Sequence, residues 1–361
     1  MTVTTKEEVA AQLEGYRIEL TGYCYRMLGS AAEADDAVQE TMVRAWRHAG
    51  GFEGRSSLRS WLYRIATNVC LAASEGRRRR ALPVDLGPAS EPGSGPLTTR
   101  PEPTWIEPVP DHRVLPAASL ATSPTDSTDP ADRVVARESI RLAFVAALQY
   151  LPPRQRAVLI LREVLRWSAA DVAELLDTTA VSVNSALQRA RAGLAAGGVD
   201  PDRALRPDPA QLDEQHRALL ARYVDAFERF DIDEIVTLLH EDAVSQMPPV
   251  TMWFRGPEAL RRATTAGGAG ADQPCRGSKM VPVAANGSAA FAQYRPDRPG
   301  EATGGFHAWG LQVVEMAGGR ITTLTSFLDA ATIFPRFGLP LDLPPTEPAP
   351  TTEPAHPIER T

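Results

Sequence analysis

Cysteine and histidine are scarce in this sequence, and their placement excludes two kinds of scaffold. The 361 residues include three cysteines and six histidines. Cys24, Cys70 and Cys275 are far apart and odd in number, which argues against a disulfide framework. No histidine stands at metal-ligand spacing from another histidine or a cysteine. We therefore expect free thiols, no metal and no other cofactor.

Long hydrophobic runs are also missing. No stretch approaches the roughly eighteen consecutive apolar residues of a membrane-spanning helix, and the first residues lack the apolar segment of a secretory signal. Hydrophobic residues make up 43% and charged residues 23% of the chain, which are values of folded proteins. The sequence predicts a cytoplasmic protein of two or three domains with no membrane partner.

Proline, in contrast, is abundant and clustered. Of the 31 prolines, eleven lie in residues 81–130 and seven in residues 340–361. This composition predicts an extended linker over residues 81–131 and a proline-rich tail over residues 336–361, neither of them a packed domain. Trp105 and Ile106 interrupt the polar linker, which indicates that this short segment docks on a domain. A chance aromatic residue is the alternative.

The charge is unevenly distributed. The net charge is −7, yet residues 55–80 contain seven arginines and a single glutamate, whereas residues 201–361 contain 15 basic and 21 acidic residues. A basic segment on an acidic chain is typical of a focused contact with a polyanion. An ordinary solvated helix face is the alternative.

Two regions have the hydrophobic periodicity of helices. Residues 7–80 predict a compact helical bundle that is interrupted near Gly29 and near Gly50. Residues 132–197 predict further helices and end in a helix-turn-helix pattern, in which Ser168 caps the first helix and Asp171 completes a near capping box. A plain helical hairpin is the alternative for this pattern.

Residues 211–335 have a different pattern. Two amphipathic helices are followed by four segments that predict strands, at residues 279–284, 288–294, 306–315 and 320–328, with a turn at residues 317–319. The expected fold class is multidomain: two all-α domains, the helical bundle and then the helix-turn-helix unit, followed by an α+β domain.

The helical regions together resemble a known family. The segment DDAVQETMVRAW at residues 35–46, with SSLRSWLYRIATN at residues 56–68, resembles region 2 of sigma-70 factors of the extracytoplasmic-function type. Residues 151–191, which begin LPPRQR, resemble region 4 of the same family. Residues 211–335 resemble a SnoaL-like domain, and the combination is similar to subgroups of the family with a fused C-terminal domain.

The resemblance implies roles for particular side chains. Core RNA polymerase would contact one set: Asp36, Gln39, Glu40, Arg44 and Trp46. The −10 promoter element would contact another: Phe52, Arg59, Trp61, Arg64, Asn68, Arg77, Arg78, Arg79 and Arg80. The −35 element would contact a third: Ser182, Asn184, Ser185, Gln188, Arg189 and Arg191. A linker motif comprises Trp105, Ile106, Glu107 and Pro108.

Two features of the resemblance leave alternatives open. Trp61 also lies in an apolar helical stripe, so a core position is its alternative role. The last helix has Asn184 and Ala186 where the family often has basic residues, and fewer cations predict weaker phosphate binding. We therefore expect modest −35 affinity, supplemented by tethering on RNA polymerase.

The sequence thus predicts a sigma factor that binds core RNA polymerase and promoter DNA and is regulated in cis by its SnoaL-like domain. It is not expected to be an enzyme. The alternatives are a ligand-responsive helix-turn-helix repressor and a SnoaL-type enzyme fused to a DNA-binding unit. Enzymatic chemistry would need an acid or base from His240, Asp242, His307 and Asp329. A small-molecule ligand would need an open cavity lined by Trp253, Phe254, Phe291, Trp309 and Phe327, which could instead fill the core.

Overall fold

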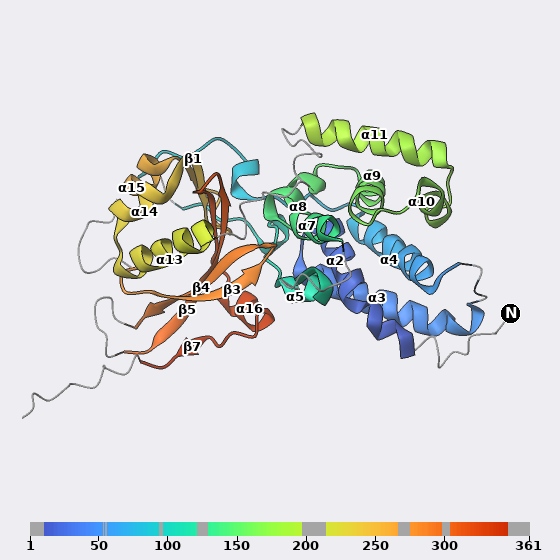
Figure 1. The fold of residues 1–361 in the computed structure, drawn as a ribbon, viewed down its shortest axis with the longest axis horizontal. Coiled ribbons are helices and arrows are strands. Elements are labelled where there is room, and N and C mark those ends of the chain that lie inside the picture. The colour runs from blue at the N-terminus through green and yellow to red at the C-terminus, as the bar shows by residue number, and fades with distance from the viewer. Residues whose placement is uncertain are drawn as a thin grey trace, which may run out of the picture.

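The computed structural model describes residues 11–52, 54, 56–93, 97–120, 129–196, 214–265, 275–297 and 304–345. Figure 1 shows two halves side by side, one of packed helices and one built on a twisted sheet with helices over it. Among the residues described, no helix has the length and apolar character needed to cross a bilayer. The multidomain fold class predicted from the sequence is confirmed.

Over residues 14–74, the first helical unit consists of three packed α-helices and two short 3₁₀ turns. Its elements are η1 (Glu14–Tyr16), α2 (Arg17–Leu28), α3 (Ala31–His48), η2 (Ala49–Gly51) and α4 (Leu58–Ser74). Gly29 ends α2 in the left-handed region, at φ 71°, and the Ser30 side chain then caps α3 by accepting the Glu33 amide. Ser57 caps α4 in the same way. These caps account for the break predicted near Gly29.

The second helical unit ends in the helix-turn-helix. Its elements are α7 (Pro130–Glu138), α8 (Leu142–Gln149), α9 (Pro153–Leu159), the π-helical turn η5 (Ile160–Val164), α10 (Ala169–Leu175) and α11 (Ala180–Ala196). The capping box of Ser168 and Asp171 is confirmed, with both reciprocal hydrogen bonds present. Asp177 turns the chain between α10 and α11 at φ 51°.

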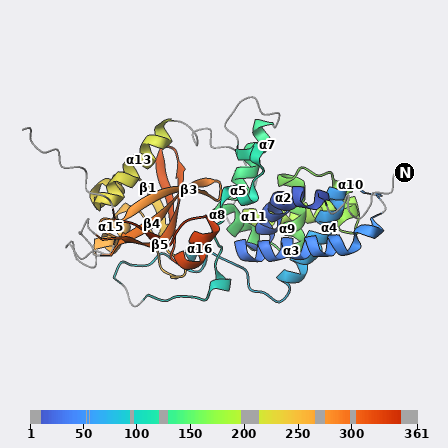
Figure 2. The same cartoon turned by 90° about the horizontal axis from the view of Figure 1, so that it is seen from below.

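The linker is more structured than its composition predicts. It contains η3 (Pro83–Asp85), η4 (Glu102–Thr104), α5 (Asp111–Val114) and α6 (Ala117–Leu120). The chain runs out to the sheet, where the Ser90 amide donates to Trp253 at 2.8 Å, and then returns to the bundle, as Figure 2 shows. Packing was expected from the sequence only at Trp105 and Ile106, because the other apolar residues of the linker follow no helical or strand period.

The C-terminal half is α+β. Its helices are α13 (Glu214–Arg229), α14 (Ile232–Leu238), α15 (Pro257–Thr265) and α16 (Ala330–Arg336). Its strands are β1 (Leu239–Gln246), β2 (Trp253–Arg255), β3 (Lys279–Ala285), β4 (Ser288–Pro296), β5 (Phe306–Ala317), β6 (Arg320–Phe327) and β7 (Asp342–Leu343). In the described residues these strands form one sheet in the order β2-β1-β6-β5-β4-β3, with β7 paired to β5. Only the β1–β6 pair of that sheet is parallel.

The four predicted strands correspond to β3 through β6, and three others were missed. Strand β1 carries Glu241 and Asp242 at exposed positions, which hides its alternation. The predicted tail is also partly structured, because β7 pairs with β5 and Tyr294 donates a hydrogen bond to the Pro340 carbonyl at 2.9 Å. The prolines of this segment therefore flank a short edge strand at its start.

The hydrophobic core crosses the domain boundaries. One cluster of buried side chains lies between the sheet and α13 and α14, and includes Tyr223 and Phe291. A second cluster is continuous from the three-helix bundle through the linker and the helix-turn-helix unit to the other part of the sheet, and includes Ile106 and Phe334. The three parts of the chain therefore pack as one body with a shared interior.

Candidate functional site

The outer face of α3 carries the predicted polymerase contacts. Asp36, Gln39 and Arg44 are exposed, and Arg44 pairs with Glu40 one turn earlier at 2.6 Å. Trp46 is 52% exposed beside a shallow groove of about 280 Å³ formed by η1, α2 and α3. An exposed tryptophan next to such a groove is typical of a protein-protein contact.

The predicted −10 residues of α4 gather around one aromatic pair. Phe52 and Trp61 are each partly buried, with ring centroids 5.1 Å apart, so Trp61 is both a packing residue and partly accessible. Asn68 is exposed two turns further along the same helix. The aromatic pair and the amide form the kind of surface on which an unstacked base can rest.

Helix α10 covers part of this surface. Arg64 donates a hydrogen bond to the Glu174 carbonyl of α10, and the Arg59 guanidinium lies 5.3 Å from the ring of Trp167, just before α10. Arg59 also donates to the Glu19 carboxylate at 2.5 Å. The narrow space that remains is lined by Trp61 and Arg64 from α4 and by acidic residues from α10. The −10 surface and the helix-turn-helix unit are thus in direct contact.

Two buried arginines strengthen the contact between the helical units. Arg26 of α2 donates to the Ser139 hydroxyl at 2.9 Å. Arg156 of α9 donates to the Met27 carbonyl of α2 and, at 2.8 Å, to Gln149. Burial lowers the pKa of each guanidinium to about 10. Both cations are satisfied by carbonyl and hydroxyl oxygens, which demands accurate positioning of the two units.

The arginine run after α4 divides into surface and buried members. Arg77, Arg78 and Arg79 are exposed, and Arg79 stacks on Tyr150 with 3.7 Å between its guanidinium carbon and the ring centroid. Arg80 is only 5% exposed and donates to the Trp105 carbonyl at 2.6 Å and to Glu33 at 2.9 Å. The structure therefore places Arg80 away from the DNA surface on which the sequence analysis put it.

The predicted −35 residues lie along α11, at the outer edge of the helical half (Figure 1). Ser182, Asn184, Gln188 and Arg189 are exposed, and Ser185 is partly exposed. Arg191 is also exposed and pairs with Glu163 at 2.9 Å. The opposite face of α11 buries Val183, Ala190 and Leu194, so the helix presents its polar side outward.

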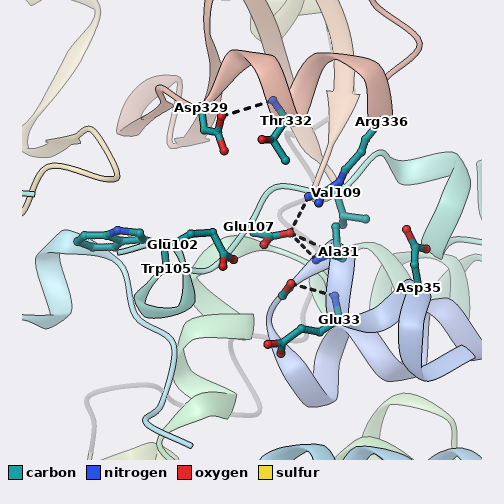
Figure 3. Close-up of polar contacts among 12 residues, drawn as sticks. Ala31, Glu33, Asp35, Glu102, Trp105, Glu107, Val109, Asp329, Thr332 and Arg336 are labelled. Carbon is teal, nitrogen blue, oxygen red and sulfur yellow. Dashed lines mark hydrogen bonds and ion pairs between the residues drawn. The ribbon is translucent and has the colours of Figure 1, made fainter. Parts of the chain in front are cut away.

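The linker motif docks at the start of α3. Trp105, Ile106, Glu107 and Pro108 are all buried. The Glu107 carboxylate accepts the Ala31 and Ala32 amides at 3.1 and 3.2 Å, at the positive end of the helix dipole. Figure 3 shows Arg336 of α16 approaching the same carboxylate, at 2.7 Å.

The linker motif, the start of α3 and the end of α16 form a junction. A hairpin turn of the sheet, Asn286-Gly287 between β3 and β4, enters it. Asn286 is fully buried at φ 53°. Its backbone amide donates to the Val109 carbonyl of the linker at 3.1 Å, and its side-chain oxygen accepts the Val109 amide at 3.0 Å. Its amide donates to the Tyr25 hydroxyl at 2.6 Å and to the Ile140 carbonyl at 2.9 Å. One side chain thus joins the C-terminal domain to both helical units and the linker.

The sequence did not indicate Asn286, Tyr25 or Arg336 as functional residues. An Asn-Gly dipeptide between two strands is a strong hairpin signal. Nothing in that signal identifies a tyrosine 261 positions earlier as the partner of Asn286. Arg336 ends a short helix that the sequence analysis did not predict.

The candidate acids and bases of the C-terminal domain do not converge. His307 is exposed on β5 between Asp342 and Asp297, whose carboxylates raise its pKa. Asp329 caps α16 by accepting the Thr332 amide. His240 accepts the Asp242 amide within β1. These four groups occupy separate positions and form no shared site.

The candidate cavity aromatics are mostly packing residues. Four of them are buried: Trp253, Phe254, Phe291 and Phe327. The Trp253 indole donates to the Gly87 carbonyl of the linker at 3.0 Å. Trp309 is 36% exposed, and the Arg295 guanidinium lies over its ring at 3.1 Å. Among the residues described, no three His, Cys, Asp or Glu side chains lie close enough together to hold a metal ion.

Comparisons with known proteins agree on all three parts of the chain. Residues 13–80 match Sigma-70 region 2, residues 141–194 match Sigma-70 region 4, and residues 220–324 match the SnoaL-like domain. The ECF RNA polymerase sigma factor SigG of Mycobacterium tuberculosis (strain ATCC 25618 / H37Rv) is 46% identical over 341 residues, which cover 92% of this chain and 84% of SigG. SigJ of the same strain is 28% identical over 64% of this chain and 62% of SigJ.

The arrangement of the parts also has a counterpart among solved structures. The crystal structure of the Mycobacterium tuberculosis extracytoplasmic function sigma factor SigJ aligns with a TM-score of 0.53 at 21% identity. The alignment covers 92% of this chain and 99% of the SigJ chain. At this identity the likeness concerns the fold.

Proposed function

The chain belongs to the extracytoplasmic-function family of RNA polymerase sigma factors, which direct promoter-specific transcription initiation, and we propose that its linker and SnoaL-like domain hold it in a closed, restrained state. In this state region 4 lies on the surface of region 2 that would contact the −10 element. RNA polymerase binding would separate the two regions and expose that surface.

The contact between α10 and α4 carries this proposal. Arg64 is engaged by the Glu174 carbonyl, and Trp61 faces a space bordered by Asp171 and Glu174. Two carboxylates at this position repel DNA phosphates, and a DNA strand and α10 cannot occupy the same surface. A −10 strand would therefore bind only after α10 has moved away.

The C-terminal domain supports the closed state through contacts with both helical units and the linker. Asn286 bonds to Tyr25 of region 2 and to Ile140 beside region 4, while Arg336 pairs with Glu107 in the linker. The transition to the open state would break these buried hydrogen bonds. The equilibrium between closed and open states would be set by this loss against the gain from RNA polymerase contacts.

The exposed residues suggest how the open state works. The α3 face around Trp46 would bind core RNA polymerase, and α11 would bind the −35 element through Asn184, Gln188 and Arg189. Both surfaces are already accessible in the closed state. Polymerase could therefore make its first contact on α3 before region 4 has moved.

We assign the SnoaL-like domain a structural and regulatory role, not a catalytic one. His307 and Asp329 are engaged in local ion pairing and helix capping, and the domain's hairpin turn is committed to the junction. A catalytic acid or base would have to face a substrate cavity.

The test is in vitro transcription with core RNA polymerase on fragments of the source genome, using the full chain. Gly287 has φ 67°, and a Cβ there would meet the Arg137 carbonyl at 2.6 Å, so Gly287→Ala should wedge the turn out of the junction. Gly318→Ala is a matched control, because Gly318 has φ 57° in another hairpin and faces open space.

We expect transcripts that depend on the added protein. At limiting protein, the yield should be several-fold higher with Gly287→Ala than with Gly318→Ala. Equal yields from the two folded variants would contradict the restraint. An absence of promoter-dependent transcripts with every variant would contradict the assignment of the α3, α4 and α11 surfaces.

A further inference from the structure

A pocket lies where the linker, region 4 and the sheet meet. Its volume is about 200 Å³, well above the roughly 15 Å³ that a single water needs. Leu82 and Val84 form its linker wall, and Ala147 and Leu194 form its region 4 wall. The sheet forms its floor. The pocket is separate from the space between the sheet and α13, where the domain's own core lies.

The floor is a row of three side chains across three neighbouring strands. Val244 of β1 pairs in register with Thr323 of β6, and Thr323 pairs with Glu315 of β5. Residues directly opposite each other in a sheet point to the same face. All three line the pocket, so a carboxylate, a hydroxyl and an isopropyl group lie in sequence along its floor.

Glu315 is the unusual member of this row. It is 9% exposed, and within the described part of the chain its carboxylate has neither a hydrogen-bond donor nor an ion-pair partner. Because Glu315 lines the pocket, a cation that enters the pocket can reach this carboxylate. The other carboxylate at the pocket, Asp85, already accepts the Leu82 amide at 2.8 Å and the Tyr150 hydroxyl at 3.2 Å.

The lining determines which ligand chemistry fits. Among the described lining residues there is no lysine, arginine or histidine, so the pocket offers nothing to balance an anion. Its walls are mainly aliphatic, which favours an apolar body. We propose that this pocket binds a small amphipathic amine, with its ammonium group on Glu315 and its alkyl body between the linker and region 4.

The position of the pocket gives this ligand a regulatory role, which rests on the function proposed above. An amine bound here would touch the sheet, the linker and α8 and α11 at once. It would bind the closed state, in which these elements form the pocket, and not the open one. Bound amine would therefore shift the population toward the closed state.

Calorimetry and thermal denaturation of the full chain, without polymerase or DNA, test the binding. The probes are hexylamine, hexanol and hexanoate, which share an alkyl body and differ in the head group. We expect hexylamine to raise Tm with concentration, hexanol to do so at least tenfold less effectively, and hexanoate to have no effect. Equal effects of the three probes would overturn the proposal.

Three variants test whether hexylamine binds in this pocket. Glu315→Gln keeps the side-chain shape and should weaken hexylamine binding at least tenfold. Glu241→Gln, at an exposed position of β1 away from the pocket, is the control and should bind as the unmodified chain does. Ala143→Leu fills the pocket from an exposed position of α8 and should also weaken binding. Unchanged hexylamine binding by Glu315→Gln would overturn the proposal, whatever the fate of the other variants.

The regulatory role of the amine is tested by a separate measurement. In the transcription assay, hexylamine should lower the yield with the unmodified chain and not with Glu315→Gln. Binding without this effect would overturn the link between the pocket and the closed state. A restraint detected with Gly287→Ala but no amine binding would overturn the ligand proposal alone, so the two failures are distinguishable.

Discussion

Arg336 and Glu107 meet at 2.7 Å across 229 positions of the sequence, and their contact joins the last turn of α16 to the N-terminus of α3. Their side chains are 19% and 11% exposed. The Glu107 carboxylate thus lies between a guanidinium and the positive end of a helix dipole. Burial alone would raise the pKa of Glu107, but a hydrogen bond from Glu102, the Arg336 guanidinium and the Ala32 amide together hold it below its usual value.

Loss of the Arg336 side chain should loosen the junction. We expect Arg336→Ala to lower the free energy of unfolding by about 1–3 kcal/mol, because Glu107 loses a charged donor while remaining buried. A double-mutant cycle with Glu107→Gln, measured by denaturant unfolding, should give a coupling of about 1–2 kcal/mol. Arg262→Ala is the control, because the Arg262 side chain is exposed and its ion pair with Glu258 is long, at 4.0 Å, and therefore weak. Coupling near zero would show that the contact contributes nothing.

Asp111 makes the junction sensitive to pH. Burial raises its pKa from 3.8 to about 6, even though its carboxylate accepts the Gly287 amide at 2.8 Å. Because the folded state binds the proton more tightly than the unfolded state, stability from this group is present below pH 4 and is lost between about pH 4 and pH 6. The loss amounts to about 3 kcal/mol.

Asp111→Asn should remove this dependence. Its Tm should match the unmodified chain below about pH 4, exceed it increasingly between about pH 4 and pH 6, and keep a constant advantage above about pH 7, because the amide carries no charge to desolvate. Thermal denaturation across that range provides the measurement. A Tm difference that is the same at every pH would contradict the titration of Asp111.

Arg78 and Arg80 should separate DNA binding from stability. Arg78→Ala should leave Tm almost unchanged and reduce the salt dependence of promoter binding by about one phosphate contact. Arg80→Ala should lower the free energy of unfolding by about 2–3 kcal/mol, because it leaves Glu33 and the Trp105 carbonyl without their buried donor. Promoter binding by the holoenzyme at several salt concentrations and denaturant unfolding measure the two effects. The reverse pattern would place Arg80 at the DNA.

Trp46 should matter for RNA polymerase and not for folding. We expect Trp46→Ala to weaken binding to core RNA polymerase at least tenfold, since an exposed tryptophan beside a groove is a typical hot spot. Ile18→Ala is a suitable control, because Ile18 is an apolar residue of α2 that is 40% exposed. Equal affinity of the two variants would exclude the α3 face as the main contact.

The sequence predicted the elements whose patterns are local. Strands β3 to β6 were found from local segments of sequence, with a glycine turn at residues 317–319 between the last two, and the capping box of Ser168 indicated the start of α10. The short helices of the linker were missed because their apolar residues are ordered by surfaces of other domains. The same reason explains the arginine run, where only the fold distinguishes buried Arg80 from exposed Arg78.

The continuous core that includes Ile106 and Phe334 has a consequence for how such chains can be recombined. The boundaries visible in sequence are not boundaries of folding, because each segment completes the interior of another. A C-terminal domain transplanted from a relative would fit only if its hairpin turn and the surface that receives that turn were transferred together. The three segments must therefore change in concert, as the parts of a single domain do.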